Sequence, residues 1–192
     1  MAVGTPFEIP VAVALGTGMR RGEILALRWL DIDFETGTVR VCRTLQHTSR
    51  GISIEEPKTA KSRRIVALPL FLVQLLGKQR DLRRYGQATS GDDWTAADFI
   101  MEAKHGQPWD PDIFSASWPR FLRKVGLPHV RFHDLRHAHA TIMLVKGVHP
   151  KVVSERLGHA NIGITLDIYS HVLPTMQAEA ARAIDEVFSP DP

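Results

Sequence analysis

The chain has 192 residues, enough for one full domain but short for two, and its 44% hydrophobic and 23% charged residues are ordinary for a globular protein. The sequence has neither an apolar run near the ~18 residues of a membrane span nor a signal peptide, and its single cysteine, Cys42, excludes an intrachain disulfide and suits a reducing cytoplasm. A formal net charge of +3 permits a nucleic-acid partner without requiring one.

The first half of the chain predicts two short helices followed by strands. A capping box with proline at its second position, Thr5–Glu8, begins the first helix, which ends near Gly16. A second helix is expected over 20–29, with Ile24, Leu25 and Leu27 facing inward. β-type patterns then cover 36–45, 51–59 and 63–70 and predict a small three-stranded antiparallel sheet.

The second half is predicted to be helical. Its expected helices cover residues 70–85, 110–126, 133–147, 149–158 and 175–188. Proline at the start of the fourth of these and Gly158 at its end are typical helix boundaries. The fold class is therefore mainly α with a small three-stranded antiparallel sheet (α+β), in one domain over 1–192.

Residues 130–147, VRFHDLRHAHATIMLVKG, combine an apolar and a polar pattern. At 100° per residue, one stripe is expected to face the core, and it consists of Leu135, Ala138, Ile142 and Val145. His133, Arg136 and His137 fall roughly opposite, so we expect them to face a ligand or solvent instead.

An anion is the better candidate for that ligand than a metal. His133 and His137 have the i, i+4 spacing of a zinc pair, but Arg136 beside them adds a permanent positive charge that disfavours a cation. The planar fork of an arginine matches two phosphate oxygens, and a histidine one turn earlier can exchange a proton near neutral pH. Alone, His-x-x-Arg is a weak motif.

Other motifs along the chain make the pattern specific. TGMRRGE at 17–23 is followed by Lys58 between two expected strands, HDLR at 133–136, LGH at 157–159, and Tyr169 ten residues after His159. This ordered set resembles the tyrosine recombinase family of the phage-integrase type, and the resemblance covers residues 5–188.

The resemblance implies a role for each motif residue. Arg20 and Arg136 would bind non-bridging oxygens of a scissile DNA phosphate, with Glu23 orienting the site. Lys58, with Lys61 as the less favoured alternative, would protonate the 5′-oxygen leaving group. The remaining catalytic residues would be His133 as general base or phosphate ligand, His159 as hydrogen-bond donor and Tyr169 as nucleophile.

The chemistry needs neither a metal nor another cofactor. Two guanidiniums can stabilise the charge that accumulates on phosphate oxygens, and a general acid can assist the 5′-alkoxide. The phosphotyrosyl bond would retain the energy of the broken DNA bond, so religation would need no ATP. Basic runs elsewhere add expected DNA contacts at Arg43, Lys61, Arg63 and Arg64.

The resemblance also sets expectations for domains and partners. Core-binding and arm-binding domains precede the catalytic domain in such integrases and are absent here, so we expect a fragment that binds DNA weakly as a monomer. The full-length protein is expected to form a homo-tetramer on double-stranded DNA attachment sites in the cytoplasm of a bacterium. The C-terminal helix, about 174–188, can dock on a neighbouring subunit.

Two alternative functions share part of this pattern. A type IB topoisomerase uses a similar tyrosine, arginine, lysine and histidine set to relax supercoils. A non-catalytic DNA-binding remnant would use residues 140–158, whose pattern is typical of a helix-turn-helix, but would leave Arg20, Lys58, His159 and Tyr169 unexplained.

Overall fold

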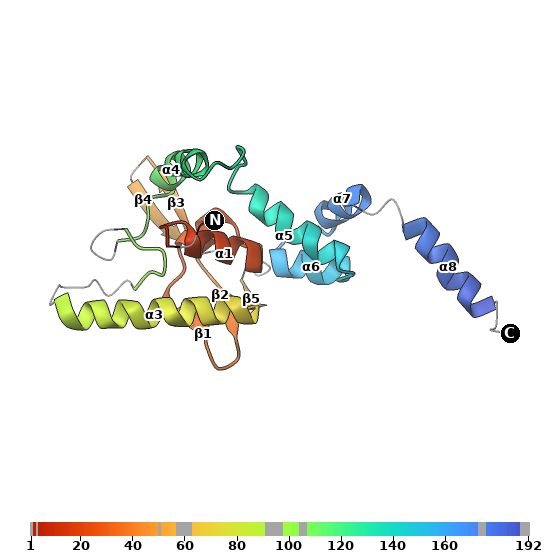
Figure 1. Cartoon of the computed structure of the whole chain (residues 1–192), viewed down its shortest axis with the longest axis horizontal. Coiled ribbons are helices and arrows are strands. Elements are labelled where there is room, and N and C mark those ends of the chain that lie inside the picture. Colours follow the sequence, from red (N-terminus) through yellow and green to blue (C-terminus); the bar gives the residue numbers. More distant parts are fainter. Residues whose placement is uncertain are drawn as a thin grey trace.

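The computed structural model describes residues 2, 4–49, 51–56, 63–90, 98–103, 107–172 and 176–188 (Figure 1). The N-terminal body contains short helices, a sheet, a hairpin and two longer helices. Its helices are α1 (Glu8–Thr17), α2 (Arg21–Leu25), α3 (Leu70–Ser90) and α4 (Pro111–Lys124). A hydrophobic core lies among these elements, and Ile24, Leu25 and Leu27 are buried in it as predicted.

The β residues form two separate antiparallel units. The first is a three-stranded sheet in the order β1 (Ile32–Asp33), β2 (Thr38–Val41) and β5 (Arg64–Ala67). The second is a hairpin of β3 (Thr44–Thr48) and β4 (Gly51–Glu55). The small antiparallel sheet is confirmed, but its strands are divided differently, because the predicted strand 36–45 breaks at Cys42 and Arg43 and its second half pairs with 51–55.

Four helices follow within the described part of residues 134–188. They are α5 (Asp134–Val145), α6 (Pro150–Leu157), α7 (Gly163–Val172) and α8 (Met176–Phe188). A second, smaller core lies between α5 and α6 and consists of Ala140, Leu144, Val153 and Leu157. Ile168 of α7 packs against it. Helix α7 was not predicted, whereas α8 was, and α8 extends away from the other helices (Figure 1). Within the described ranges, no helix combines the length and apolarity needed to cross a membrane.

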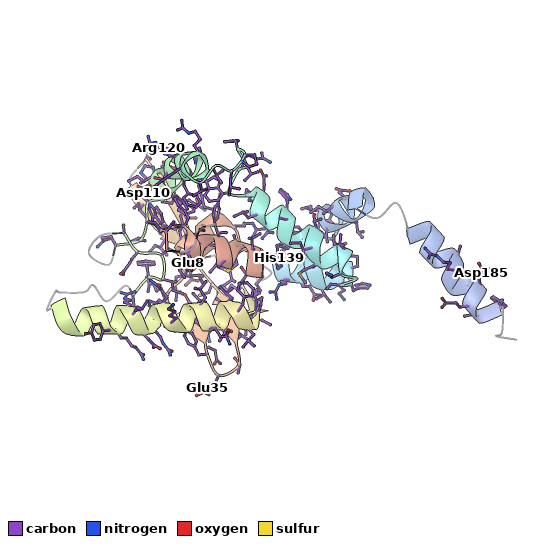
Figure 2. The ribbon with its side chains drawn as sticks, viewed as in Figure 1. Glu8, Glu35, Asp110, Arg120, His139 and Asp185 are labelled. Atoms are coloured by element: carbon purple, nitrogen blue, oxygen red, sulfur yellow. The ribbon has the colours of Figure 1, made fainter. Side chains whose placement is uncertain are left out.

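The predicted inward face of α5 is right at Leu135, which packs against the larger core, but wrong toward the end of the helix. Ile142 and Val145 are 55% and 56% exposed, whereas Arg136 and His139 are buried with Ala140 and Leu144. Polar side chains line the buried face because backbone carbonyl groups of α1 and α6 meet them there. His139 lies where α5 approaches α1, with its Nδ1 2.7 Å from the carbonyl oxygen of Leu15 (Figure 2).

Gly18, which caps the end of α1, lies close to side chains of α5 and α6. Its φ is 68°, and a Cβ added there would lie 2.5 Å from the Leu157 side chain and 2.6 Å from His139. Gly18→Ala should therefore lower the free energy of unfolding by about 3 kcal/mol or more, from left-handed strain and overpacking together.

Gly147→Ala is the matched control for this prediction. Its φ is 77°, but the added Cβ would meet nothing within 4 Å, so the cost should be only about 1–2 kcal/mol. Urea unfolding of both variants measures the difference, and equal losses would contradict the predicted clash at Gly18.

Candidate active site

The carboxyl end of α6 collects three arginine side chains. Its last turn presents the carbonyl oxygens of Arg156, Leu157 and Gly158, three consecutive residues. They accept hydrogen bonds from Arg64 Nε (2.7 Å), Arg136 Nη2 (2.8 Å) and Arg20 Nη2 (3.0 Å), respectively. Carbonyls at this end of a helix lack intrahelical partners and carry its partial negative charge, so they attract cations. Gly158, with a φ of 67°, ends α6 as predicted.

Arg20 is fixed at the start of α2. Its backbone N–H donates to Glu23 Oε2 at 2.8 Å, and its Nη1 donates to Glu23 Oε1 at 2.9 Å. The Arg20 side chain is nevertheless 42% exposed. The guanidinium is thus held in one orientation and still accessible to a ligand.

Arg136 is more deeply buried than Arg20, His133 and His159, the other predicted catalytic residues whose burial is described. The residue is 4% exposed, and Nη1 donates to the Gly18 carbonyl at 2.6 Å. Burial and the positive charge of Arg20 lower the pKa of Arg136 to about 9, so the guanidinium stays charged at neutral pH. Its two carbonyl bonds use two of five N–H donors and leave others for an anion.

Glu23 is the buried carboxylate among these cations. Burial alone would raise the pKa of Glu23, but hydrogen bonds and positive charge from Arg64 and Arg20 outweigh that effect and hold the pKa below its ordinary value. Arg64 donates to both carboxylate oxygens, at 3.1 and 2.9 Å.

His159 follows Gly158 directly and lies in the field of the same arginines. Burial, with the positive charges of Arg136 and Arg20, lowers the pKa of His159 to about 4, so the ring is neutral at pH 7. Its Nδ1 shares a 2.8 Å hydrogen bond with the hydroxyl of Thr165, a buried residue of α7. Thr165 was missed in the sequence, since no helix was predicted around it and nothing in its spacing relates it to His159.

His133 lies at the N-terminus of α5, beside a groove. Burial, His137 and Arg136 lower the pKa of His133, and the rings of His133 and His137 are 5.0 Å apart. The groove has a volume of about 670 Å³. Its basic and imidazole lining consists of Arg20, Arg21, His47, His129, Arg131 and His133.

The predicted nucleophile and the predicted lysines remain to be placed. Tyr169 lies in α7, four residues or about one helical turn after Thr165, and α7 packs against α5 and α6. Lys58 and Lys61 lie outside the described residues.

The structure also places three of the arginines that we expected to contact DNA. Arg63 is exposed and pairs with Glu56. Arg43 pairs with buried Asp31 at 2.8 Å. Arg64 is bound to Glu23 and α6, with its side chain 7% exposed, so its observed partners differ from the DNA phosphate expected for it.

The histidines outside the motif pattern include one with a packing role. Arg156 Nε donates to His139 Nε2 at 3.2 Å, so the proton of the neutral ring lies on Nδ1 and bonds to Leu15. His137 is exposed. Among the described residues, no three histidine, cysteine or carboxylate side chains gather as metal ligands.

Comparison with known proteins shows the family to which this chain belongs. The sequence profile of the phage integrase family matches residues 7–176. A tyrosine recombinase XerC-like protein of Caldanaerobacter subterraneus is 34% identical over 92% of this chain and 48% of its own. The ICEBs1 integrase of Bacillus subtilis is 31% identical over 94% of this chain and 49% of its own.

Solved structures show the same fold. The Tn1549 transposon integrase, determined in complex with circular intermediate DNA, matches with a TM-score of 0.78 and 25% identity, over 92% of this chain and 59% of that one. XerA recombinase matches all of this chain and 60% of its own, with a TM-score of 0.70 and 25% identity. The chain thus spans about half the length of its curated relatives. It belongs to the phage integrase family of tyrosine recombinases.

Proposed function

We propose that this chain is the catalytic domain of a site-specific DNA recombinase. The observation that carries the proposal is the convergence of Arg20 and Arg136 on the end of α6, directly before His159. Three guanidiniums with one buried carboxylate make a site whose unmatched charge is positive. Such a site favours a phosphodiester, whose equatorial oxygens gain negative charge during attack.

The proposed step is an in-line displacement. Tyr169 Oη forms a bond to phosphorus while the bond from phosphorus to the 5′-oxygen breaks. The tyrosine proton passes to His133, and Lys58 donates a proton to the departing oxygen. Arg20, Arg136 and neutral His159 donate hydrogen bonds to the non-bridging oxygens. The product is a 3′-phosphotyrosyl bond, which a 5′-hydroxyl of another strand can attack to religate the DNA.

The proposal extends to assembly and cellular context. Double-stranded attachment sites of bacterial or phage DNA would be the substrates, and four copies of the full-length protein would exchange strands in the nucleoid. Helix α8 fits a role in joining subunits, because it extends away from the other helices and exposes Ile184, Val187 and Phe188 (Figure 1). The 192-residue chain by itself is expected to be a monomer.

Tyr169→Phe should abolish covalent adducts while leaving DNA affinity within about threefold, because only the nucleophilic oxygen is removed. The assay incubates the chain with a randomised pool of nicked duplexes whose short cleaved end diffuses away, and detects SDS-resistant adducts. The same pool is offered to the chain joined to an upstream DNA-binding domain. Adducts that persist in Tyr169→Phe would refute the assignment, and binding without adducts in both formats would favour a DNA-binding remnant.

The pH dependence of cleavage should follow His133. A base must be neutral to accept a proton, and the pKa of His133 is lowered from its ordinary value of about 6.5. The midpoint of the acid limb of the cleavage rate should therefore lie below about pH 6.5, the ordinary pKa of histidine. Single-turnover rates between pH 5 and 9 measure this, and an acid limb centred above ~6.5 would contradict it.

Chelation of divalent metal should leave the rate of adduct formation unchanged within about twofold, because arginines rather than a metal ion are proposed to neutralise the phosphate. The measurement compares wild-type rates with and without EDTA at constant ionic strength. Restoration of a lost rate by added Zn²⁺ would instead support a metal role for His133 and His137.

A further inference from the structure

Arg64 occupies a central position in the arginine cluster, although it is none of the motif residues. It lies on β5 and reaches both α2 and α6: its two terminal nitrogens donate to Glu23, and its Nε donates to the Arg156 carbonyl. All three contacts join elements that are distant in sequence, and the Arg64 side chain is only 7% exposed. We propose that Arg64 is a positioning residue that acts on the reaction through Glu23 and Arg20.

The first step of this coupling is electrostatic. Glu23 is buried, and burial alone would favour its neutral form. A neutral carboxyl group has one oxygen that donates instead of accepting, so it could not serve both Arg64 and Arg20 as it does here. The bidentate contact from Arg64 keeps Glu23 ionised, and both of its oxygens remain acceptors.

The second step is geometric. Each oxygen of Glu23 is shared between the two arginines: Oε1 accepts from Nη1 of both, and Oε2 accepts from Arg64 Nη2 and the Arg20 backbone. Arg64 thereby fixes the carboxylate that orients Arg20. Gly158 leaves room for the Arg64 side chain, because a Cβ at position 158 would lie only 2.9 Å from Arg64 Nη1.

A lysine could not replace all of these contacts. Its single ammonium could approach Glu23, but it cannot match the fork to both oxygens and also reach the Arg156 carbonyl. Arg64→Lys should thus retain the positive charge and the fold but lose some of the hydrogen bonds to Glu23 and Arg156. Arg64→Met should lose the positive charge and all of these hydrogen bonds. This graded pair separates positioning from simple packing.

The pKa of Glu23 tests the first step directly, and without any need for catalysis. It is measured by NMR titration of the side-chain carboxyl carbon, assigned with Glu23→Gln. The pKa should lie below the ordinary value of about 4.3 in the wild type, rise above it in Arg64→Met, and lie between the two in Arg64→Lys. Arg63→Met controls for the loss of a neighbouring surface charge and should leave the Glu23 pKa unchanged. An unchanged pKa in both Arg64 variants would overturn the proposal.

A double-mutant cycle tests the second step, which rests on the proposed function. Arg64→Met and Glu23→Gln should each slow Tyr169-dependent adduct formation by roughly 10²-fold, the scale expected for displacing a catalytic group by about 1 Å. The double variant should be no slower than the slower single variant, because both changes release Arg20. Multiplied losses would refute action through Glu23. If the wild type formed no adduct either alone or joined to the upstream DNA-binding domain, the proposed function would fail, whereas the titration would still decide whether Arg64 governs Glu23.

Discussion

The carboxyl end of α6 is the feature on which the site depends. Three guanidiniums would repel one another if they were brought together in a weakly solvated interior. Here each guanidinium donates a hydrogen bond to a different carbonyl oxygen, and the three carbonyls belong to consecutive residues. They lie at the end of a helix, where carbonyls lack intrahelical partners and the helix dipole is negative. Glu23 supplies the further negative charge. These contacts hold the arginines in place in the absence of substrate, which would lower the reorganisation needed during the proposed phosphoryl transfer.

The same cluster determines the protonation of its surroundings. His159 and His139 adjoin the arginines and are partly or fully buried, and their pKa values are lowered as a result. A neutral imidazole can donate one hydrogen bond and accept another, as His139 does between Leu15 and Arg156. Neutral histidines also leave the arginines as the main positive charges, so the attraction for an anion is focused on them.

Much of the fold and of the site could be predicted from the sequence. Most helix boundaries follow proline, glycine and apolar spacing, as at Pro150 and Gly158. The ordered motifs from Arg20 to Tyr169 resemble the family that the comparisons show. The structure brings Arg20, Glu23 and Arg136 together at the end of α6, directly before His159. Motif residues are predictable because their chemistry restricts the residue type at each position.

Three of the errors have a common physical origin. Hydrophobic spacing predicted that Ile142 and Val145 face the core. It cannot show that carbonyl groups at α1 and α6 accept hydrogen bonds from Arg136 and His139, which allows these polar side chains to be buried instead. Arg64 stands in a basic run and resembles a DNA contact until the fold places it against Glu23. Strand pairing was misassigned at Cys42 and Arg43, where Arg43 turns to buried Asp31. In each case a polar contact with a residue distant in the sequence determined the observed structure, and the local sequence does not identify such a partner.

A crystal structure of the chain bound to a nicked duplex, with Tyr169→Phe to prevent cleavage, would test the central claim most directly. Arg20 and Arg136 should contact oxygens of one phosphate while their Nη2 atoms keep the hydrogen bonds to the Gly158 and Leu157 carbonyls. Departure of either arginine from its carbonyl, or a phosphate bound away from this pair, would contradict a site that α6 assembles in advance.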